Sequence, residues 1–331
     1  MTPKVSVIVC TYNQEDTIGA ALDSILAQET GFDFEIVVAD DCSADSTPEI
    51  CRRYADRYPG KVRAIINETN KGIADNYYDT LYECRGKYIA DLAGDDLWTD
   101  PHKLARQAAL MDSDPSIVLC HGAWQFLHPD GSMSFSENHA VPDQDYVVDG
   151  SEMLPYLLQH RKEEVFIHLC TSMYRRDTAI ALTQKYSDFF YGRDLPCEDF
   201  QLEVLMAASG RIAYDCTPVL AYRVGHDSIS SMQNPGKAAV FASKVAVMTK
   251  KLAEELTFDP SRLEDFYTRQ MLFAISKAFI SGKAEAAAHA MTGTAFVSPQ
   301  LPARARFALA VMKIKPLWAV SRMAYRLFQR Q

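Results

Sequence analysis

The sequence GKYIADLAGDDLWTDP, at residues 86–101, is the most informative feature of this chain. It starts as an apolar strand pattern and runs directly into two adjacent acids, Asp95 and Asp96. Asp100 and Pro101 then predict the cap and the first residue of a helix. Two acids at the end of a buried strand repel each other and lose solvation, so we expect a cation or a polar ligand to compensate them. A solvated acidic loop is the alternative for this segment taken alone.

The first half of the chain repeats the order strand, polar loop, helix. The predicted strands are 5–10, 35–39, 62–66 and 87–92, and the predicted helices are 17–28, 47–58, 73–84 and 101–111. This alternation predicts an α/β protein with a parallel, doubly wound sheet and helices on both of its faces. Residues 117–127 continue the sheet, and a loop at 128–149 leads into a mixed region that ends near residue 224.

Composition indicates an ordinary globular chain with an uneven charge. Of its 331 residues, 48% are hydrophobic and 23% are charged, and the formal net charge is −9. An acidic chain is a poor general partner for nucleic acid. Residues 301–331 nevertheless contain seven basic residues and no acid, so residues 1–300 carry a net charge of −16.

The eight cysteines are scattered, and no two of them form a C-x-x-C pair. This spacing predicts neither a zinc site nor a disulfide framework. No apolar run approaches the ~20 residues that span a bilayer, and no secretory signal pattern precedes the first strand. The sequence therefore predicts a cytoplasmic protein.

Polar clusters follow the first four predicted strands. They are Thr11-Tyr12-Asn13, Asp40-Asp41-Cys42-Ser43-Ala44-Asp45, Asn70-Lys71-Gly72 and Gly94-Asp95-Asp96. Any one of them could be turn chemistry, but ligands of open α/β sheets bind at this carboxyl edge. The chain has no G-x-G-x-x-G after its first strand and no P-loop, which disfavours dinucleotide dehydrogenases and P-loop enzymes. We expect ligand recognition to depend on acids and a metal instead.

Three of these segments resemble motifs of the inverting family 2 glycosyltransferases, which have the GT-A fold. The matching segments are Val5-Ser-Val-Ile-Val-Cys-Thr-Tyr-Asn13, Ile36-Val-Val-Ala-Asp-Asp-Cys-Ser43 and Gly94-Asp-Asp-Leu-Trp-Thr-Asp-Pro101. The resemblance covers residues 4–230 and implies a doubly wound, mostly parallel sheet with a helical C-terminal extension. It also implies sugar transfer from a nucleotide-sugar to an acceptor hydroxyl, usually with Mn²⁺ or Mg²⁺, in the synthesis of a bacterial cell-surface polysaccharide.

The resemblance assigns the nucleotide-sugar pocket to residues at the sheet edge. Asp41 would accept a hydrogen bond from the base N–H, with Asp40 beside it. A carboxylate only accepts, so it selects a ring that donates, such as uracil, and we expect a UDP-sugar donor. The other residues expected to contact the nucleotide-sugar are Thr11, Tyr12, Asn13, Asn70, Gly72, Asp96 and Arg223.

The same resemblance places a divalent metal at Asp95, which matches the last acid of the family's D-x-D motif. Carboxylate oxygens suit Mn²⁺ or Mg²⁺, and the cation would neutralise the diphosphate leaving group. The first acid of the motif falls at Ala93, so the ribose or metal contact usually made there is missing. Asp96 or Asp91 could replace it, although strand alternation would point Asp91 away from the site.

The segment Pro196-Cys-Glu-Asp-Phe-Gln-Leu-Glu203 resembles the family's Glu-Asp motif at the start of a helix. This resemblance assigns Asp199 as the general base and Glu198 as a neighbour that orients the acceptor. In the implied single displacement, Asp199 takes the acceptor proton, the oxygen attacks C1 and the nucleoside diphosphate leaves with inversion. Both acids could equally be first-turn residues that the helix dipole stabilises.

Residues 222–230 resemble the family's loop that closes over the diphosphate. The resemblance assigns Arg223 as a pyrophosphate contact and His226 as a metal or phosphate ligand. The alternative for a lone histidine is an ordinary surface position.

The acceptor wall is expected farther along the predicted sheet. Residues 165–174 are predicted to be a strand of this wall, with His168 and Ser172 exposed. Trp98 and Trp124 could stack on a sugar, but core packing is favoured for each of them.

The C-terminal third changes to Ala-rich helix, predicted at 237–256 and 263–291, followed by a basic tail. On a helical wheel, one side of this tail carries Phe307, Val311, Ile314, Trp318 and Tyr325, flanked by Arg304, Lys315 and Arg322. A basic amphipathic helix of this kind predicts docking on an anionic membrane surface. Pro316 must kink or split the helix. Packing of the tail on the acidic catalytic domain is the alternative.

We therefore expect three parts, a GT-A catalytic domain at 1–230, a helical extension at 231–300 and a basic amphipathic tail at 301–331. The catalytic domain would have a nucleotide-binding half at 1–115 and an acceptor-binding half at 116–230. The enzyme is expected in the cytoplasm, with contact to the inner face of the cytoplasmic membrane through its tail.

Two other functions fit part of the sequence. A sugar-nucleotide pyrophosphorylase shares a doubly wound sheet and paired acids, but it needs a Gly-rich, Arg-containing loop that residues 11–15 do not provide. A non-catalytic nucleotide-sugar-binding protein would keep the fold, and Ala93 is the sequence feature that suggests it.

Overall fold

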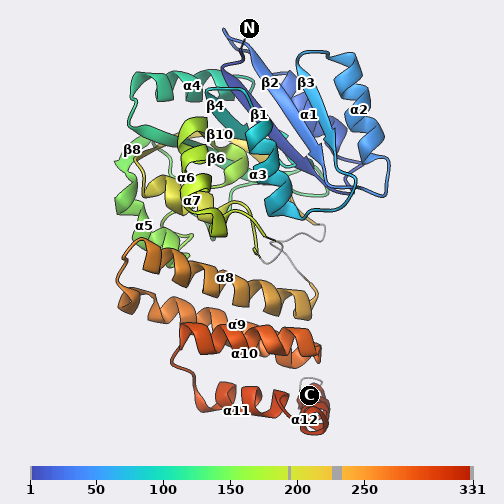
Figure 1. Cartoon of the computed structure of the whole chain (residues 1–331), viewed down its shortest axis with the longest axis vertical. Helices are drawn as coiled ribbons and strands as arrows, with labels where there is room; N and C mark the ends of the chain where they lie inside the picture. The colour runs from blue at the N-terminus through green and yellow to red at the C-terminus, as the bar shows by residue number, and fades with distance from the viewer. Residues whose placement is uncertain (1, 193–194, 226–232, 329–331) are drawn as a thin grey trace. The chain divides into compact units, whose positions relative to one another are not determined.

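A mixed sheet forms the centre of the N-terminal unit in the computed structural model (Figure 1). The structure describes residues 2–192, 195–225 and 233–328, with side chains through Met323. The strand order is β3-β2-β1-β4-β9-β6-β10-β5, with β7 paired to β6 and β8 paired to β10. The strands are β1 Val5–Thr11, β2 Phe34–Asp40, β3 Val62–Ile66, β4 Tyr88–Asp91, β5 Leu97–Trp98, β6 Ile117–Leu127, β7 Met133–Ser134, β8 Tyr146–Asp149, β9 Met173–Arg175 and β10 Arg211–Arg223.

The chain divides into two compact units, residues 1–157 with 161–225 and residues 158–160 with 226–331. The helices up to residue 207 are α1 Ile18–Leu26, α2 Thr47–Arg57, α3 Ile73–Glu83, α4 Lys103–Ser113, α5 Gly150–Leu158, α6 Arg176–Lys185 and α7 Phe200–Ala207. The helices of the second unit are α8 Pro235–Glu255, α9 Glu264–Ser281, α10 Ala284–Val297, α11 Ala303–Met312 and α12 Lys315–Phe328.

Strands β1 to β4 and their helices have the predicted α/β order. β1 pairs in parallel with β2 and β4, and β2 pairs in parallel with β3. Val5, Val7 and Val9 pack with Leu22 and Ile25 of α1, whereas α3 covers the sheet face turned toward the viewer in Figure 1. Because helices cover both faces, β1 and β2 are buried along almost their whole length, including the polar Ser6 and Glu35.

The second half of the sheet is mixed. β9 is antiparallel to both β4 and β6, whereas β6 and β10 are parallel to each other. Antiparallel pairing needs no crossover helix between the paired strands. β9 accordingly follows a short 3₁₀ turn at Leu169–Thr171. The α/β GT-A class is thus as predicted, with parallel pairing concentrated in the first four strands.

The predicted strand at 165–174 is wrong over most of its length. Thr171 N donates to His168 O over 2.8 Å and Ser172 N donates to Leu169 O over 2.8 Å, so the chain turns here. Strand pairing begins only at Met173. A continuous apolar run does not distinguish a buried turn from a buried strand.

The helix predicted to start at Pro101 starts two residues later, at Lys103. Residues 97–98 form β5, an unpredicted short strand that pairs antiparallel with β10. The Asp100 carboxylate accepts the His102 N–H over 3.0 Å, so it still satisfies a donor at the helix start.

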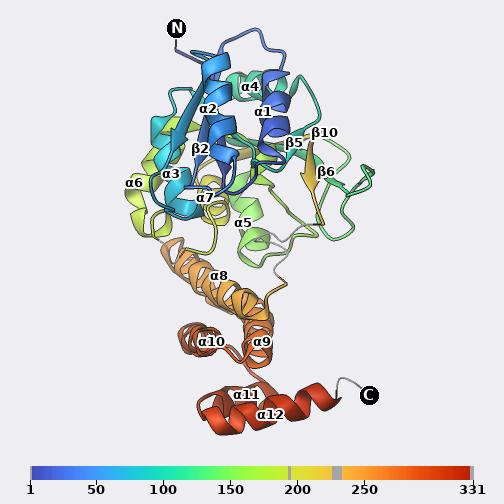
Figure 2. The ribbon, with the colours of Figure 1, turned by 90° about the vertical axis from the view of Figure 1, so that its right-hand side faces the viewer.

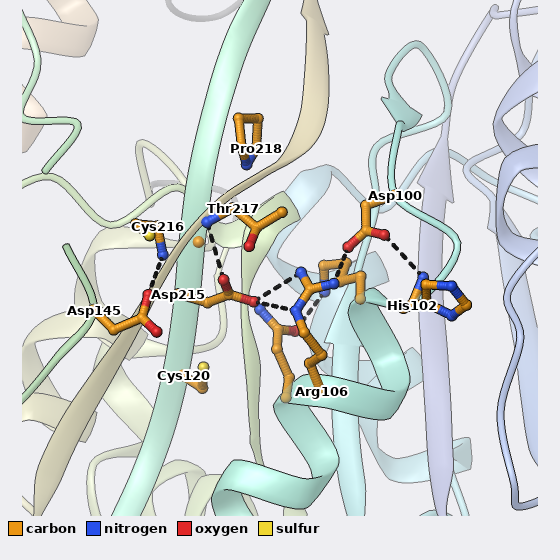
Figure 3. Close-up of polar contacts among 12 residues, drawn as sticks. Asp100, His102, Arg106, Cys120, Asp145, Asp215, Cys216, Thr217 and Pro218 are labelled. Carbon is orange, nitrogen blue, oxygen red and sulfur yellow. Dashed lines mark hydrogen bonds and ion pairs between the residues drawn. The ribbon is translucent and has the colours of Figure 1, made fainter. Parts of the chain in front are cut away.

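An ion-pair network ties α4 to β10 (Figure 3). Arg106 Nε donates to Asp215 Oδ2 over 2.9 Å, and the Arg106 guanidinium also pairs with Asp100. Asp215 begins the irregular stretch through Pro218, where the register of β10 against β6 shifts. The network therefore holds the helix against a bulged part of the sheet.

The second unit is a stack of Ala-rich helices. Ala239, Ala278, Ala286 and Ala290 are buried between them, and small side chains allow the helices to approach closely. The helix predicted at 263–291 is split, because α9 ends with Gly282 at φ +70°, a left-handed cap that glycine favours.

The C-terminal tail consists of two helices, α11 and α12, which lie beyond α9 and α10 at the end of this unit (Figures 1 and 2). Pro316 lies in the first turn of α12, so the predicted interruption occurs just before it. No helix within the described ranges is long and apolar enough to cross a membrane.

Candidate functional site

The carboxyl ends of β1 to β4 meet at one edge of the sheet, and the predicted polar clusters lie together there. Backbone hydrogen bonds join the loops: Asp41 N donates to Thr11 O over 3.0 Å, and Gly94 N donates to Cys10 O over 3.3 Å. The parallel pairing of these strands brings the loops to the same edge, as the sequence predicts.

At the end of β1 the Tyr12 ring is exposed, whereas the side chains of Thr11 and Asn13 bind neighbouring loop residues. Tyr12 is 50% exposed, so its ring is available to a ligand. Thr11 is buried, and its hydroxyl donates to Gln14 Oε1 over 2.7 Å. Asn13 Oδ1 accepts the Ala44 N–H over 2.8 Å, which joins this loop to the one after β2.

Asp41 holds the loop that follows β3. Its carboxylate accepts the Lys71 N–H over 2.8 Å, the Gly72 N–H over 2.9 Å and the Asn67 amide over 3.2 Å. Asn70 Nδ2 donates to the Asp41 carbonyl over 3.1 Å. A carboxylate offers about four acceptor directions, and these donors occupy three of them. Among the described residues Gly72 is the donor to Oδ2, so this oxygen keeps one acceptor direction in a side chain that is 4% exposed.

Asp40 shapes the turn in which Asp41 lies. It is fully buried and accepts the Ser43 N–H over 3.0 Å as well as the Ser43 hydroxyl. Cys42 has φ +63°, the left-handed conformation that this turn requires. Asp40 thus fixes the turn that positions Asp41.

Asp95 and Asp96 are held by the end of β10. Asp96 Oδ1 accepts the Arg223 N–H over 2.9 Å, and Arg223 Nε donates to the Asp95 carbonyl over 3.0 Å. Asp96 is 1% exposed, and its Oδ2 has no hydrogen-bond partner among the described residues. Burial, followed by the charge of Asp95, raises the pKa of Asp96 well above its ordinary value. A cation beside this pair would relieve both effects.

The residues around Asp95 fit a divalent cation that is bound mainly by its substrate. The part of the chain that the structure describes has no group of three or more His, Cys, Asp or Glu side chains placed to hold a metal. Mg²⁺ commonly uses one or two carboxylates together with substrate phosphates, and Asp95 with the orphaned Asp96 oxygen matches that donor set.

Asp91 does not take the place of the acid missing at Ala93. Its Oδ1 accepts the Tyr77 hydroxyl over 2.7 Å, and Tyr77 in turn contacts the Tyr174 hydroxyl at 2.6 Å. The side chain is 3% exposed and faces α3, as strand alternation predicts. Burial raises its pKa to about 8.

Glu198 and Asp199 lie at the start of α7. Asp199 caps the helix, because its Oδ1 accepts the Phe200 N–H over 2.7 Å. The Glu198 carbonyl accepts the Tyr78 hydroxyl of α3. Desolvation and the neighbouring charge of Asp199 raise the pKa of Glu198 to about 8. Asp199 is thus held by a backbone N–H at the start of α7, whereas Glu198 is desolvated beside it.

Glu203 is a third acid of this region to which the sequence assigned no role. It is 7% exposed, and burial followed by the charge of Asp199 raises its pKa well above the ordinary value. Its spacing of four residues from Asp199 on one helix face is the sequence signal that could have indicated it.

The predicted acceptor wall is buried more deeply than expected. Ser172 is completely buried, which contradicts its predicted exposure, and His168 is partly buried among aromatic rings. Trp98 donates its indole N–H to Cys170 O over 2.8 Å, and Trp124 is 3% exposed. Both tryptophans belong to the core, as favoured above.

The remaining predicted ligand, His226, lies outside the described residues.

A groove of about 560 Å³ lies between α3 and the end of β3. Its lining includes Asn67, Lys71, Asn76, Tyr82 and Tyr191. Through Lys71 it borders the loop that Asp41 holds, and through Tyr191 it borders the segment that leads to α7.

Comparison with known sequences identifies relatives of the N-terminal part. The uncharacterized protein Rv1520 of Mycobacterium tuberculosis is 42% identical over 128 residues, 39% of this chain and 37% of that protein. The succinoglycan biosynthesis protein ExoO of Rhizobium meliloti is 39% identical over 111 residues, 34% of this chain and 30% of ExoO. The chain thus matches well under half the length of these relatives.

Two solved structures share the fold over nearly the whole chain. S. aureus TarS in complex with UDP-GlcNAc has a TM-score of 0.62 and 20% identity, covering 98% of this chain and 92% of the TarS chain. The mannosyltransferase PcManGT from Pyrobaculum calidifontis, in complex with GDP-Man and Mn²⁺, has a TM-score of 0.51 and 18% identity, covering 98% and 88%. The family model for Glycosyl transferase family 2 matches residues 6–182, more than half of the chain. With the site at the carboxyl edge of a GT-A sheet, this match shows that the chain belongs to glycosyl transferase family 2.

Proposed function

We propose that this family 2 enzyme transfers a sugar from a UDP-sugar to a hydroxyl group of a cell-surface glycan or a lipid-linked acceptor, with inversion. The observation that carries the proposal is the pair Asp95 and Asp96, held by Arg223 at the sheet edge, with one Asp96 oxygen unpartnered among the described residues. TarS binds UDP-GlcNAc and PcManGT binds GDP-Man, which supports a nucleotide-sugar donor. The role of ExoO in succinoglycan biosynthesis supports a glycan product.

The donor would lie over the carboxyl edge of the sheet. The exposed Tyr12 ring offers a face for the base, and the remaining Oδ2 direction of Asp41 can accept its N–H. Asp95, with the orphaned oxygen of Asp96, would hold Mn²⁺ or Mg²⁺, which supplies charge neutralisation for the diphosphate.

Asp199 would act as the general base toward the acceptor hydroxyl. The Phe200 N–H bond orients its carboxylate, which takes the proton as the hydroxyl oxygen attacks C1 of the sugar. Burial and the charge of Asp199 raise the pKa of Glu198, which favours its protonated form, and a protonated carboxyl can donate a hydrogen bond to the acceptor. A positioned general base contributes about 10²–10⁴-fold to the rate.

The acceptor would approach along the groove beside α3. Tyr82 and Tyr191 offer partly exposed rings there, and Lys71, Asp79 and Glu83 line the same groove with charged groups, a combination that suits a sugar chain. We place the enzyme in the cytoplasm, with peripheral contact to the membrane through residues 302–331 when the acceptor is lipid-linked.

A thermal-shift titration with UDP, GDP, CDP and dTDP, each with and without Mn²⁺, tests the donor site. We expect UDP to give the largest shift and Mn²⁺ to increase it, because the metal links Asp95 to the diphosphate. No shift with any of the nucleotides would contradict the proposal.

Replacement Asp199→Asn tests the base, with UDP release from a panel of UDP-sugars as the measurement. We expect turnover to fall about 100-fold or more while the UDP thermal shift is unchanged, because the amide keeps the shape but cannot take a proton. The exposed Asp188 is the matched control, and Asp188→Asn should keep full turnover. Equal turnover in the Asp199→Asn variant would exclude Asp199 as the base.

A further inference from the structure

The outer face of α11 and α12 is rich in exposed apolar side chains. Of twelve large hydrophobic residues exposed among the described residues, five lie between positions 307 and 323. They are Phe307, Ile314, Leu317, Val320 and Met323, and each is 44–68% exposed. Leu317, Val320 and Met323 follow one another at intervals of three, which aligns them along one side of α12.

The opposite side of the same helices is packed inside the second unit. Val311 and Trp318 are buried in its core, and the Trp318 indole donates to Phe279 O over 3.1 Å. Arg322 Nη2 donates to Ile280 O over 2.9 Å. The inner face is therefore fixed against the end of α9, and the apolar outer face is a separate surface.

This arrangement corrects the membrane face predicted from the sequence. Val311 and Trp318, which the helical wheel placed on that face, are buried. The wheel treated the tail as one helix, whereas the chain breaks between Met312 and Lys315 and the helical phase changes there. The side chain of Tyr325 lies outside those that the structure describes.

We propose that the outer face formed by Phe307, Ile314, Leu317, Val320 and Met323 docks on an anionic membrane surface. A helix pair with one apolar face can bury it at the boundary between lipid headgroups and acyl chains. Apolar clusters of this kind on a soluble surface mark interaction sites. The inference rests on the proposed function for its biological purpose, since a lipid-linked acceptor would be met at that surface.

Charge favours lipid over a second copy of the chain. Arg304, Arg306 and Lys315 are exposed on the same two helices and Lys313 in the turn between them, and residues 301–331 contain no acid. A two-fold dimer through this face would bring like charges together, which opposes association. Anionic lipid headgroups complement the same charges.

Co-sedimentation with vesicles tests the proposal on the full chain. We expect the protein to sediment with mixed phosphatidylglycerol and phosphatidylcholine vesicles, and the double variant Leu317→Glu, Val320→Glu to bind about tenfold more weakly or worse, because each change places a charge in the docking face. Phe273→Glu is the matched control, an exposed apolar position on α9 that should bind like the unmodified protein. In Lys313→Gln, Lys315→Gln the preference for phosphatidylglycerol should decrease.

Three results would overturn the proposal. They are no sedimentation of the unmodified protein, equal sedimentation of the Leu317→Glu, Val320→Glu variant, and a concentration-dependent dimer that this variant abolishes in the absence of vesicle binding. Circular dichroism and the UDP thermal shift on the same variants verify the fold. Vesicle binding needs no nucleotide, so its failure is distinguishable from failure of the sugar-transfer proposal.

Discussion

The carboxylate of Asp41 connects two loops, and this determines what its replacement should do. Asp41→Asn substitutes an N–H₂ for one acceptor oxygen, so the Lys71 or Gly72 amide loses its partner. Leaving a part-buried N–H unsatisfied costs about 1 kcal/mol, and we expect that loss in the free energy of unfolding together with a smaller UDP thermal shift.

Urea denaturation and the UDP titration measure these two effects. The control is Asp56→Asn on the exposed side of α2, which should leave both unchanged. An Asp41→Asn variant with full stability and full UDP response would show that Asp41 neither holds the loop nor contacts the base.

Asp91 makes stability depend on pH. Burial raises its pKa from 3.8 to about 8, so the folded chain keeps a proton that the unfolded chain releases near pH 4. The protonated Asp91 therefore contributes fully to the free energy of unfolding below about pH 4. This contribution is lost as pH rises toward 8, and the free energy of unfolding falls by at most about 1.4 kcal/mol per pH unit.

Unfolding free energies at about pH 5 and about pH 8 check this expectation. The unmodified protein should lose more stability between these values than Asp91→Asn, in which the Tyr77 hydroxyl still finds an acceptor. Asp96, Glu198 and Lys103 remain in both proteins, and desolvation is the largest cause of each of their pKa shifts, so the difference reports mainly on Asp91. Identical losses in the two proteins would refute the assignment.

Among the elements, the attachment of α4 to β10 depends on Arg106 (Figure 3). Arg106→Met leaves Asp215, which is 8% exposed, without its cation. Because the Arg106 side chain is 36% exposed, solvent screens part of this interaction, and its removal should cost about 1–2 kcal/mol. We therefore expect a clear fall in the urea midpoint, partly restored when Asp215→Asn is added to the variant.

The exposed pair Arg52 and Glu49 on α2 provides the comparison. Arg52→Met should change the free energy of unfolding by no more than about 0.5 kcal/mol, because solvent screens such pairs. If Arg106→Met lowered the free energy of unfolding no more than Arg52→Met does, the ion-pair network would not stabilise the contact between α4 and β10.

For the whole molecule, charge is separated along the chain. Residues 1–300 carry a net charge of −16, and residues 301–331 carry seven basic residues. If the tail meets anionic lipid through these charges, raising the salt from about 50 mM to about 500 mM should weaken vesicle binding several-fold, because the Debye length shortens. Co-sedimentation across this salt range is the measurement, and binding that ignores salt would exclude the electrostatic contribution.

Deletion of residues 302–331 would not separate membrane contact from stability. Ala305, Val311, Met312 and Trp318 belong to the core of the second unit, so the deletion would uncover the buried face of α9. Point changes on the outer face leave this core intact and separate membrane contact from stability.

The first half of the fold and the position of the polar clusters follow from local sequence patterns. β3 and β6 have the predicted bounds, 62–66 and 117–127, because their signals are local apolar runs between turn residues. Parallel strands connected by helices place their carboxyl ends on one edge, so the clusters after β1 to β4 follow from chain order. The family motifs are also short consecutive segments and can be read without a structure.

Which of these side chains bind neighbouring loops and which are available to a ligand depends on long-range contacts. Asp96 meets Arg223 across 127 positions of sequence, and β9 inserts between β4 and β6 although it follows β6 along the chain. The side of the tail that is exposed likewise depends on how Trp318 packs on α9. These features arise from contacts between distant segments, and burial is set by the neighbours that folding brings together, which no local pattern encodes.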